Sequence, residues 1–387
     1  MATMITNLRR DLIEEIISRV PLRSMKAVRL TCKSWNNISK SEIFTKMQID
    51  KATTREGKTM MISVMPHNLS LMSVAVDDVD PSVEFKGQLS FLCNQVSIHK
   101  VIHCEGLLLC FLKDHTRVVV WNPYSGQTRW VKLRYPHPPS PSKWDWFRYA
   151  LGYEDKGSCR SVKFLRFLDY LPEEPENQNV CYEIYDFDSD LWTTLDVTSH
   201  SWICYSSCGV FLKGNAYWPV VKSSSEANID HIIYFDFTRE SFGPPLPLPF
   251  GATDRGYSYV NLSCVKEEKL AAFFQHYISY KYEFEIWVTT KIEAEMVSWS
   301  KFLRMDLGPN IDIPITFFID EEKKVFMGFE HREYPKRFIN IIGEAKYLRK
   351  LDLQVPQGQY CCPPLCSYVP SSIQIKKPAL RQKDRAK

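Results

Sequence analysis

Apolar residues near the start of the chain recur at the spacing of a helix. They lie at i, i+1, i+4, i+5 and i+8 of one segment: Leu12, Ile13, Ile16, Ile17 and Val20. This spacing predicts an amphipathic helix with one apolar face. Pro21 cannot continue that helix, and Ser24 is a suitable N-cap for a second one. Short helices within about 45 residues cannot bury so much apolar surface against one another, so we expect this face to have a partner.

From Thr59 onward the chain consists of short apolar runs in which alternate residues are polar, a pattern that predicts β-strands. A strand, a polar turn and a second strand recur in five segments, residues 118–133, 183–195, 233–246, 285–302 and 338–351. The intervals between these hairpins suit propeller blades with loop insertions. Four-stranded units built on them account for residues 100–353, and strands of residues 59–95 with residues 368–373 complete a sixth unit.

The predicted fold is therefore a multidomain α+β chain: a small all-α module followed by an all-β propeller of about six blades. An irregular β-sandwich is the alternative. Aromatic residues make up 13% of the 387 residues, which favours strands, because aromatic side chains fit pleated, half-buried surfaces. A net charge of +4 is small for this length and excludes a basic field suited to nucleic acid.

Two further observations indicate where the chain works. The longest apolar run, Leu107–Leu112, is too short to span a bilayer, and we recognise no signal peptide. The 12 cysteines are scattered through apolar runs, as reduced cysteines of intracellular proteins are. We expect an intracellular protein of the nucleus, the cytoplasm or both, with no membrane partner. The basic segment 376–387 is predicted to be a solvated tail, with a nuclear import signal as the alternative.

Motifs that carry catalysis are missing from the sequence. Residues 57–59 match the end of a phosphate-binding loop, but Ala52 stands where that motif needs glycine. Two tight cysteine clusters lack a second pair or histidines at zinc spacing: Cys204 with Cys208, and Cys361 and Cys362 with Cys366. We predict no catalytic residue, no metal and no cofactor, in a chain that is not an enzyme. A propeller enzyme is the alternative that remains open.

The N-terminal segment also carries a family pattern. It contains Leu-x-x-Asp-Leu from Leu8, Arg-Val-Pro-Leu from Arg19 and Thr-Cys-Lys-x-Trp from Thr31. This pattern resembles an F-box, a module that docks on a Skp-type adaptor and connects a substrate receptor to the cullin and RING subunits of a ubiquitin ligase. One departure is Arg9, where the family usually has proline. The alternative is an ordinary helical hairpin that packs on its own C-terminal domain.

The resemblance implies which residues contact the adaptor. We expect these to bury apolar surface against it: Leu8, Leu12, Ile16, Val20, Pro21, Leu22, Val28, Cys32 and Trp35. Downstream, five short motifs resemble the plant F-box-associated, kelch-like propeller domain: 119–123, 149–153, 298–302, 318–324 and 366–371. That resemblance implies a plant protein whose propeller recognises an unknown protein substrate.

Together these features predict four parts of the chain: an adaptor-binding module (1–48), a connector (49–58), a substrate-recognition propeller (59–375) and a basic tail (376–387). The predicted function is that of a non-catalytic substrate receptor in a Skp–cullin–F-box ubiquitin ligase. An interaction scaffold that binds the adaptor without ubiquitination of a target is the alternative.

A Pro-rich, aromatic insertion between two of the hairpins is the candidate substrate contact. Its residues Trp144, Trp146 and Arg148 are of the types that dominate binding interfaces. The alternative is that the two tryptophans pack beneath their own loop.

Overall fold

The structure of the protein is a computed structural model. It describes residues 8–20, 24–39, 41, 44, 58–65, 68–76, 81–88, 96, 98–114, 116–134, 147–157, 160–168, 182–197, 202–203, 209–221, 229–249, 258–278, 281–293, 296–307, 316–329, 338–343, 348–352, 365–371 and 373–375. The predicted basic tail, and the predicted connector apart from Lys58, lie outside these residues. Two compact units divide the chain: Met1–Lys132 with Leu365–Ile375, and Leu133–Pro364 with Lys376–Lys387.

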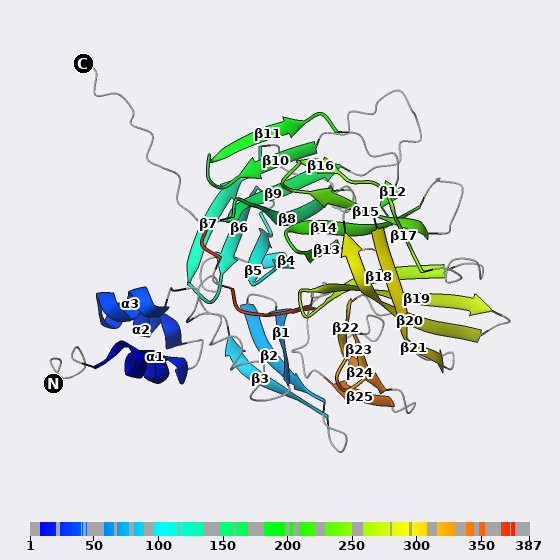
Figure 1. The fold of residues 1–387 in the computed structure, drawn as a ribbon, viewed down its shortest axis with the longest axis horizontal. Coiled ribbons are helices and arrows are strands. Elements are labelled where there is room, and N and C mark those ends of the chain that lie inside the picture. Colours follow the sequence, from blue (N-terminus) through cyan, green and yellow to red (C-terminus); the bar gives the residue numbers. More distant parts are fainter. Residues whose placement is uncertain are drawn as a thin grey trace. The chain divides into compact units, whose positions relative to one another are not determined.

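Three short helices form the N-terminal module: α1 (Arg10–Ser18), α2 (Met25–Thr31) and α3 (Lys33–Ser39) (Figure 1). Cys32 has an extended backbone (φ −161°, ψ 166°), which ends α2 and separates it from α3. Side chains from all three helices and the residues after them meet in one core: Ile13, Ile17, Met25, Val28, Ile38 and Phe44. A membrane-spanning helix is not found among the described residues.

The first unit also contains two four-stranded antiparallel sheets. One has the strand order β26 (Leu365–Ser367), β1 (Lys58–Met65), β2 (Asn68–Ala75) and β3 (Ser82–Gln88). The other follows the chain: β4 (Ile98–Cys104), β5 (Leu107–Leu112), β6 (Arg117–Asn122) and β7 (Gln127–Lys132). Every neighbour in these sheets is therefore also a neighbour in sequence, except β26.

The second unit contains four more antiparallel sheets. The first of them has β8 (Phe147–Asp155), β9 (Arg160–Leu168), β10 (Tyr182–Asp186) and β11 (Leu191–Leu195). The next has β12 (Trp202–Ile203), β13 (Val210–Leu212), β14 (Asn215–Val221), β15 (Ile229–Asp236), β16 (Ser241–Phe242) and β17 (Leu246–Pro247). The last two have β18 (Ser258–Val265), β19 (Lys269–Ile278), β20 (Lys281–Glu293) and β21 (Met296–Leu307), then β22 (Thr316–Asp320), β23 (Val325–Phe329), β24 (Phe338–Gly343) and β25 (Leu348–Asp352).

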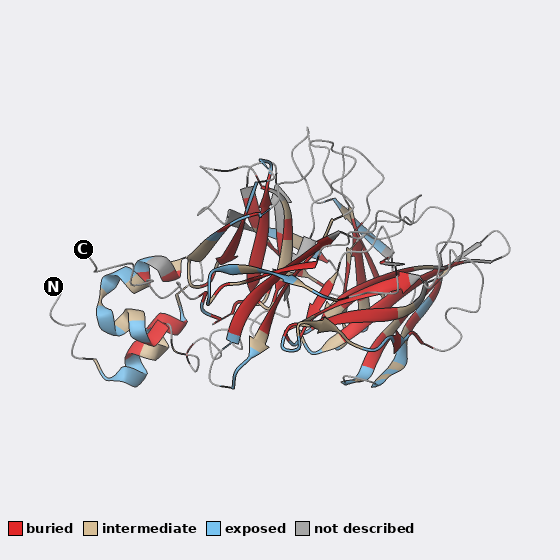
Figure 2. Cartoon of the chain, turned by 90° about the horizontal axis from the view of Figure 1, so that it is seen from above, coloured by how far each residue is buried: buried red, intermediate tan, exposed pale blue. Residues whose placement is uncertain are grey.

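The predicted fold class is confirmed: a small helical module precedes a β-propeller of six blades, one for each sheet. The five predicted hairpins are the last strands of five sheets, beginning with β6 and β7. Burial is concentrated in the strands, whereas the helices keep exposed faces (Figure 2). All six residues of β5 are buried, as expected for an inner strand that is covered on both sides.

The sixth sheet combines the two ends of the sequence, but with a different strand from the one predicted. Residues 365–367 pair antiparallel with β1, and Met61 lies opposite Ser367. The predicted strand, residues 368–373, does not form the ladder. Asn122, which is fully buried, binds this segment instead: its Nδ2 donates to the carbonyl oxygens of Ser371 (3.0 Å) and Ile373 (2.8 Å).

One type of turn recurs between four pairs of strands, three of which are predicted hairpins. An Asn or Asp at the end of the strand accepts backbone N–H groups from the following turn, and the residue four positions later has positive φ. For example, Asp236 Oδ1 accepts from the N–H of Thr238 (2.8 Å), and Glu240 has φ 52°. The positions that correspond to this pair in the other three turns are Asn122 with Gly126, Asp186 with Asp190, and Asp320 with Lys324. Side-chain capping of this kind stabilises tight turns.

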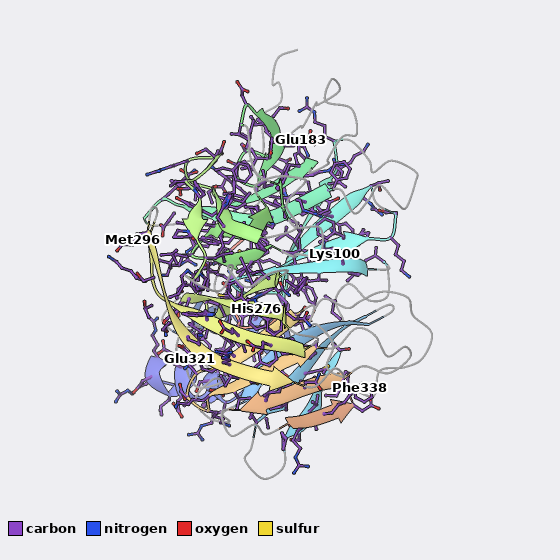
Figure 3. All side chains as sticks on the ribbon, turned by 90° about the vertical axis from the view of Figure 1, so that its right-hand side faces the viewer. Lys100, Glu183, His276, Met296, Glu321 and Phe338 are labelled. Atoms are coloured by element: carbon purple, nitrogen blue, oxygen red, sulfur yellow. The ribbon has the colours of Figure 1, made fainter. Side chains whose placement is uncertain are left out.

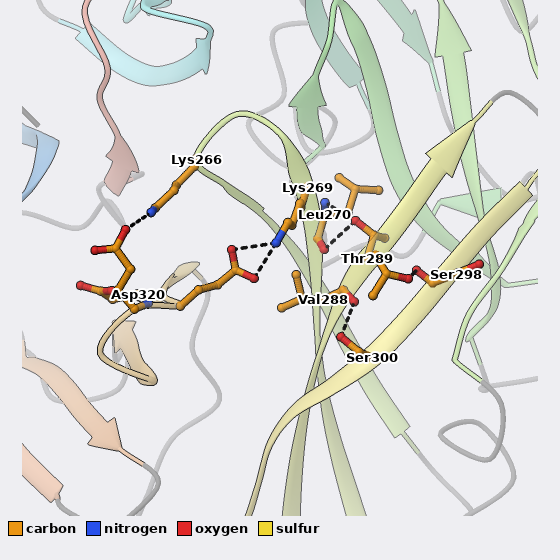
Figure 4. Close-up of polar contacts among 11 residues, drawn as sticks. Lys266, Lys269, Leu270, Val288, Thr289, Ser298, Ser300 and Asp320 are labelled. Atoms are coloured by element: carbon orange, nitrogen blue, oxygen red, sulfur yellow. Dashed lines mark hydrogen bonds and ion pairs between the residues drawn. The ribbon is translucent and has the colours of Figure 1, made fainter. Parts of the chain in front are cut away.

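Neighbouring sheets of the second unit are joined through such turns (Figure 4). The ammonium group of Lys269 contacts Glu321 at 2.8 Å, and Lys266 contacts Glu322 at 2.5 Å. The Lys269–Glu321 pair is half-buried and the Lys266–Glu322 pair is exposed, whereas the buried hydroxyl of Ser263 donates to the carbonyl oxygen of Phe317 at 2.6 Å. The buried bond fixes β18 against β22 more firmly than the surface pairs, which water and salt weaken.

Candidate functional site

Arg9, the residue that departs from the usual F-box pattern, directly precedes α1 as its N-cap. Arg9 has φ −60° and ψ 146°, so it keeps the φ that a proline ring would impose. Its carbonyl oxygen accepts the first helical hydrogen bond, from the N–H of Ile13 (3.1 Å). Its guanidinium also binds the exposed carboxylate of Asp11, at 2.9 Å. The entry into α1 is therefore formed without proline.

The apolar residues of α1 divide into two rows that face different surroundings. Ile13 (5% exposed) and Ile17 (0%) point into the core of the module. Leu12 (49%) and Ile16 (45%) are exposed to solvent instead. Residues one position apart on a helix differ by about 100°, so each row keeps its own direction along the helix. Only the Leu12–Ile16 row is available to another protein.

α2 repeats this division between core and solvent. Met25 and Val28 are buried in the module core, whereas Leu30 is 78% exposed. Leu12, Ile16 and Leu30, which we call the exposed trio, are three of the seven large apolar side chains that are exposed among the described residues. Exposed apolar side chains that lie together mark interaction surfaces, and Leu12 and Ile16 lie one turn apart on the same face of α1.

Two ion pairs lie on the surface of the helical module, along α1 and its C-terminal end. Arg10 Nε contacts Glu14 Oε1 at 2.9 Å, and Arg19 Nη2 contacts Glu15 Oε1 at 3.0 Å, both at i,i+4 spacing. Exposed pairs of this kind contribute only a few tenths of a kcal/mol to helix stability. Leu12 and Ile16 remain exposed although these pairs form.

The structure sorts the residues that were predicted to contact the adaptor. Leu12 and Ile16 are exposed, while Val28 is buried, so we reassign Val28 to the core of the module. Four are half-buried, and three of these pack against that core: Leu8, Val20 and Trp35, with Cys32 the fourth. Pro21 and Leu22 lie outside the described residues.

Sequence reasoning missed Leu30. It stands between Arg29 and Thr31, off the line of Val28 and Cys32, and an isolated leucine next to a charged residue has no periodic pattern to mark it.

The predicted substrate contact is only partly described. Trp144 and Trp146 lie outside the described residues, so their role remains a prediction. Arg148 is a half-buried residue of β8, opposite Phe167 of β9. The structure thus places Arg148 within a sheet of the second unit rather than on an exposed loop.

Buried charged residues of the second unit form local pairs. Arg166, only 1% exposed, lies 3.6 Å from Glu183 on the neighbouring strand. Burial raises the pKa of Glu183, and Arg166 and Arg134 oppose that shift. The guanidinium of Arg166 also stacks on the ring of Phe147, with Cζ 4.3 Å from the ring centroid. These contacts balance a buried cation within one sheet.

Titratable side chains of the second unit lie on several different sheets. Figure 3 labels Glu183 in β10, His276 in β19 and Glu321 in the turn between β22 and β23, which belong to three different sheets. Within the described part of the chain, no group of three His, Cys, Asp or Glu side chains could hold a metal ion. Of the predicted cysteine clusters, only Cys366, in β26, belongs to the described residues.

Comparison with known families gives two matches that together cover nearly all of the chain. The F-box domain matches residues 5–47, and the F-box associated beta propeller domain matches residues 60–375. Both predicted resemblances are confirmed, with the F-box N-terminal to the propeller. The first match contains all three helices and the exposed trio.

Individual relatives agree with these matches. A putative F-box protein of Arabidopsis thaliana is 64% identical over 382 residues, which are 97% of this chain and 92% of the relative. An F-box/kelch-repeat protein of the same plant is 55% identical over 405 residues, 99% of this chain and 92% of the relative. A third relative from this plant, named peroxiredoxin-2A, is 49% identical over 392 residues, but only 69% of its length is covered.

Proposed function

Because the chain belongs to the family of F-box proteins with an F-box associated β-propeller domain, we propose that it is the substrate-recognition subunit of a Skp–cullin–F-box ubiquitin ligase. In this role the helical module docks on a Skp-type adaptor, and through it on the cullin and RING subunits. The propeller recruits a protein target. We assign these roles to residues 1–48 and 59–375, joined by the connector 49–58 and followed by the tail 376–387.

The chain's contribution to the reaction is proximity rather than chemistry. A receptor that holds a target near a charged conjugating enzyme raises the effective concentration of the target's lysines, so no catalytic side chain is needed in the receptor itself. The F-box matches support a non-catalytic subunit of this kind. The proposed setting is the nucleus or the cytoplasm.

The exposed trio is the observation that carries the proposal. Leu12, Ile16 and Leu30 lie within the residues that match the F-box, and their exposure leaves apolar surface for an adaptor to cover. Burial of that surface stabilises a complex by about 25 cal/mol for each Å² removed from water.

A binding experiment with the full-length chain tests the proposal. Purified adaptor is captured by the wild type, by Leu12→Asp/Ile16→Asp and by Leu191→Asp. Leu191 is a matched control, because it is an exposed leucine of β11 (48%) with nearly the exposure of Leu12. We expect the double variant to lose the adaptor and the control to retain it. Equal retention by all three proteins would rule out docking through this surface.

A further inference from the structure

One residue of the β6–β7 turn differs from its counterparts in the other hairpins. Tyr124 lies two residues after the capping Asn122, at the place that Asp188 and Thr238 occupy in two turns of the second unit. Thr238 is exposed and Asp188 half-exposed, as expected at a turn, but Tyr124 is only 3% exposed. A large aromatic side chain is therefore buried at a position where the other three turns carry polar residues that are not buried, Asp188, Thr238 and Glu322.

The helical module is what covers Tyr124. Arg29 of α2 donates from Nη1 to the carbonyl oxygen of Tyr124 at 2.5 Å, and its Cζ lies 5.0 Å from the centroid of the tyrosine ring. The phenolic hydroxyl of Tyr124 donates to the carbonyl oxygen of Ser39, the last residue of α3, at 3.3 Å. A single turn residue thus holds two helices, 95 and 85 positions away in sequence.

The chemistry of Arg29 suits a lasting contact. Burial lowers the pKa of its guanidinium and the neighbouring Tyr124 opposes that shift, but arginine stays protonated at any physiological pH. Its Nε and Nη2 are buried and find no hydrogen-bond partner among the described residues. The carbonyl oxygen and the π face of Tyr124 are therefore the groups seen to compensate a partly desolvated cation.

Three successive residues of α2 have three different tasks. Val28 packs in the core of the module, Arg29 reaches the β6–β7 turn, and Leu30 is exposed to solvent.

We propose that Arg29, Tyr124 and Ser39 form a clamp that sets the orientation of the F-box helices on the sheet β4–β7. They are positioning residues: the clamp fixes the direction in which the exposed trio faces. That this direction orients a bound adaptor relative to the propeller rests on the proposed function, but the clamp itself does not.

The test measures orientation in the full-length chain without any partner. Spin labels are attached to genetically encoded ketone residues at the exposed positions Lys33, in α3, and Lys113, between β5 and β6, which avoids labelling native cysteines. Pulsed electron paramagnetic resonance then gives the distribution of the distance between them. We expect one narrow peak for the wild type. In Tyr124→Ala the peak should widen about twofold or split, because α3 loses its hydrogen bond to the phenolic hydroxyl and Arg29 of α2 loses the ring that covers its guanidinium.

Three further variants separate a clamp from a general loss of structure. Arg29→Ala leaves the sheet intact and should also widen the peak. Tyr124→Phe keeps the ring and the carbonyl contact with Arg29 and should have a smaller effect. Thr238→Ala, at the corresponding turn position of the second unit, should change nothing.

A distribution that is already broad in the wild type, or that stays narrow in both Tyr124→Ala and Arg29→Ala, would overturn the clamp. Adaptor capture by the same variants is a separate readout. If Leu12 and Ile16 prove unnecessary for adaptor capture, the proposed function is refuted and the clamp is unaffected. If the distance distributions refute the clamp, the proposed function is unaffected.

Discussion

The most specific prediction concerns the adaptor affinity of three apolar residues in the helical module. Truncation of leucine or isoleucine to alanine removes three carbon atoms, which contribute about 0.8 kcal/mol each when they are transferred from water. Leu30 is 78% exposed, so full coverage by the adaptor would give about 1.9 kcal/mol, and Leu30→Ala should weaken binding about 20-fold. For Ile16, 45% exposed, the same reasoning gives about 1.1 kcal/mol and a loss of about sixfold.

Val28 provides the contrast, because it neighbours Leu30 in sequence and faces the opposite way. Its side chain is 7% exposed, so an adaptor has little left to cover. Val28→Ala should instead lower the free energy of unfolding of the helical module by about 2 kcal/mol, through lost burial and a small cavity.

The assay is isothermal titration calorimetry of the full-length variants with a purified Skp-type adaptor, paired with circular dichroism to confirm that the helices persist. The expected order of affinity loss is Leu30→Ala, then Ile16→Ala, with Val28→Ala near the wild type while it remains folded. The reasoning is refuted if Leu30→Ala binds as the wild type does, or if folded Val28→Ala loses the most affinity.

Three other predictions follow from buried contacts. Ile17→Ala should lower the stability of the helical module by about 2–5 kcal/mol in denaturant unfolding, because Ile17 is fully buried; an unchanged midpoint would place it outside the core. Asn122→Ala removes both hydrogen bonds to the segment 368–375, so amide exchange there should accelerate, whereas unaltered exchange would mean that the ladder of β26 holds the segment alone. Lys163, 2.9 Å from Glu154, holds the pKa of that carboxyl below its usual range, so the stabilisation is present at neutral pH and is lost as pH falls through the lowered pKa. Unfolding measured against pH should show a smaller acid decline in Lys163→Met, and parallel curves would contradict this.

The spacing of apolar residues predicted the helices and the six sheets, because residues on the buried face of a helix or strand recur at the period of that element. It could not divide the α1 pattern, since Leu12, Ile13, Ile16 and Ile17 all belong to one broad stripe. Only tertiary packing decides that the row at 13 and 17 faces the core and the row at 12 and 16 faces solvent.

Contacts between residues far apart in sequence were the second feature that the sequence could not predict. Tyr124 reads as part of a tight turn, and nothing near it in sequence indicates that helices some 95 positions earlier will cover it. The available signal was the comparison between turns, where an aromatic residue replaces Asp188 and Thr238. The end strand was misplaced for a similar reason: the ladder forms at residues 365–367, and the later residues Ser371 and Ile373 instead accept hydrogen bonds from the distant side chain of Asn122.

Co-purification of cullin from cells shows whether this one chain connects a ubiquitin ligase to a target protein. The full-length protein and its Leu12→Asp/Ile16→Asp variant are recovered under proteasome inhibition, and cullin is quantified beside the proteins that each one retains. We expect the wild type to recover cullin and the double variant to lose it while retaining the same propeller-bound proteins. Cullin that is absent from the wild type, or recovered equally by both, would show that the helical module does not connect the chain to a ligase.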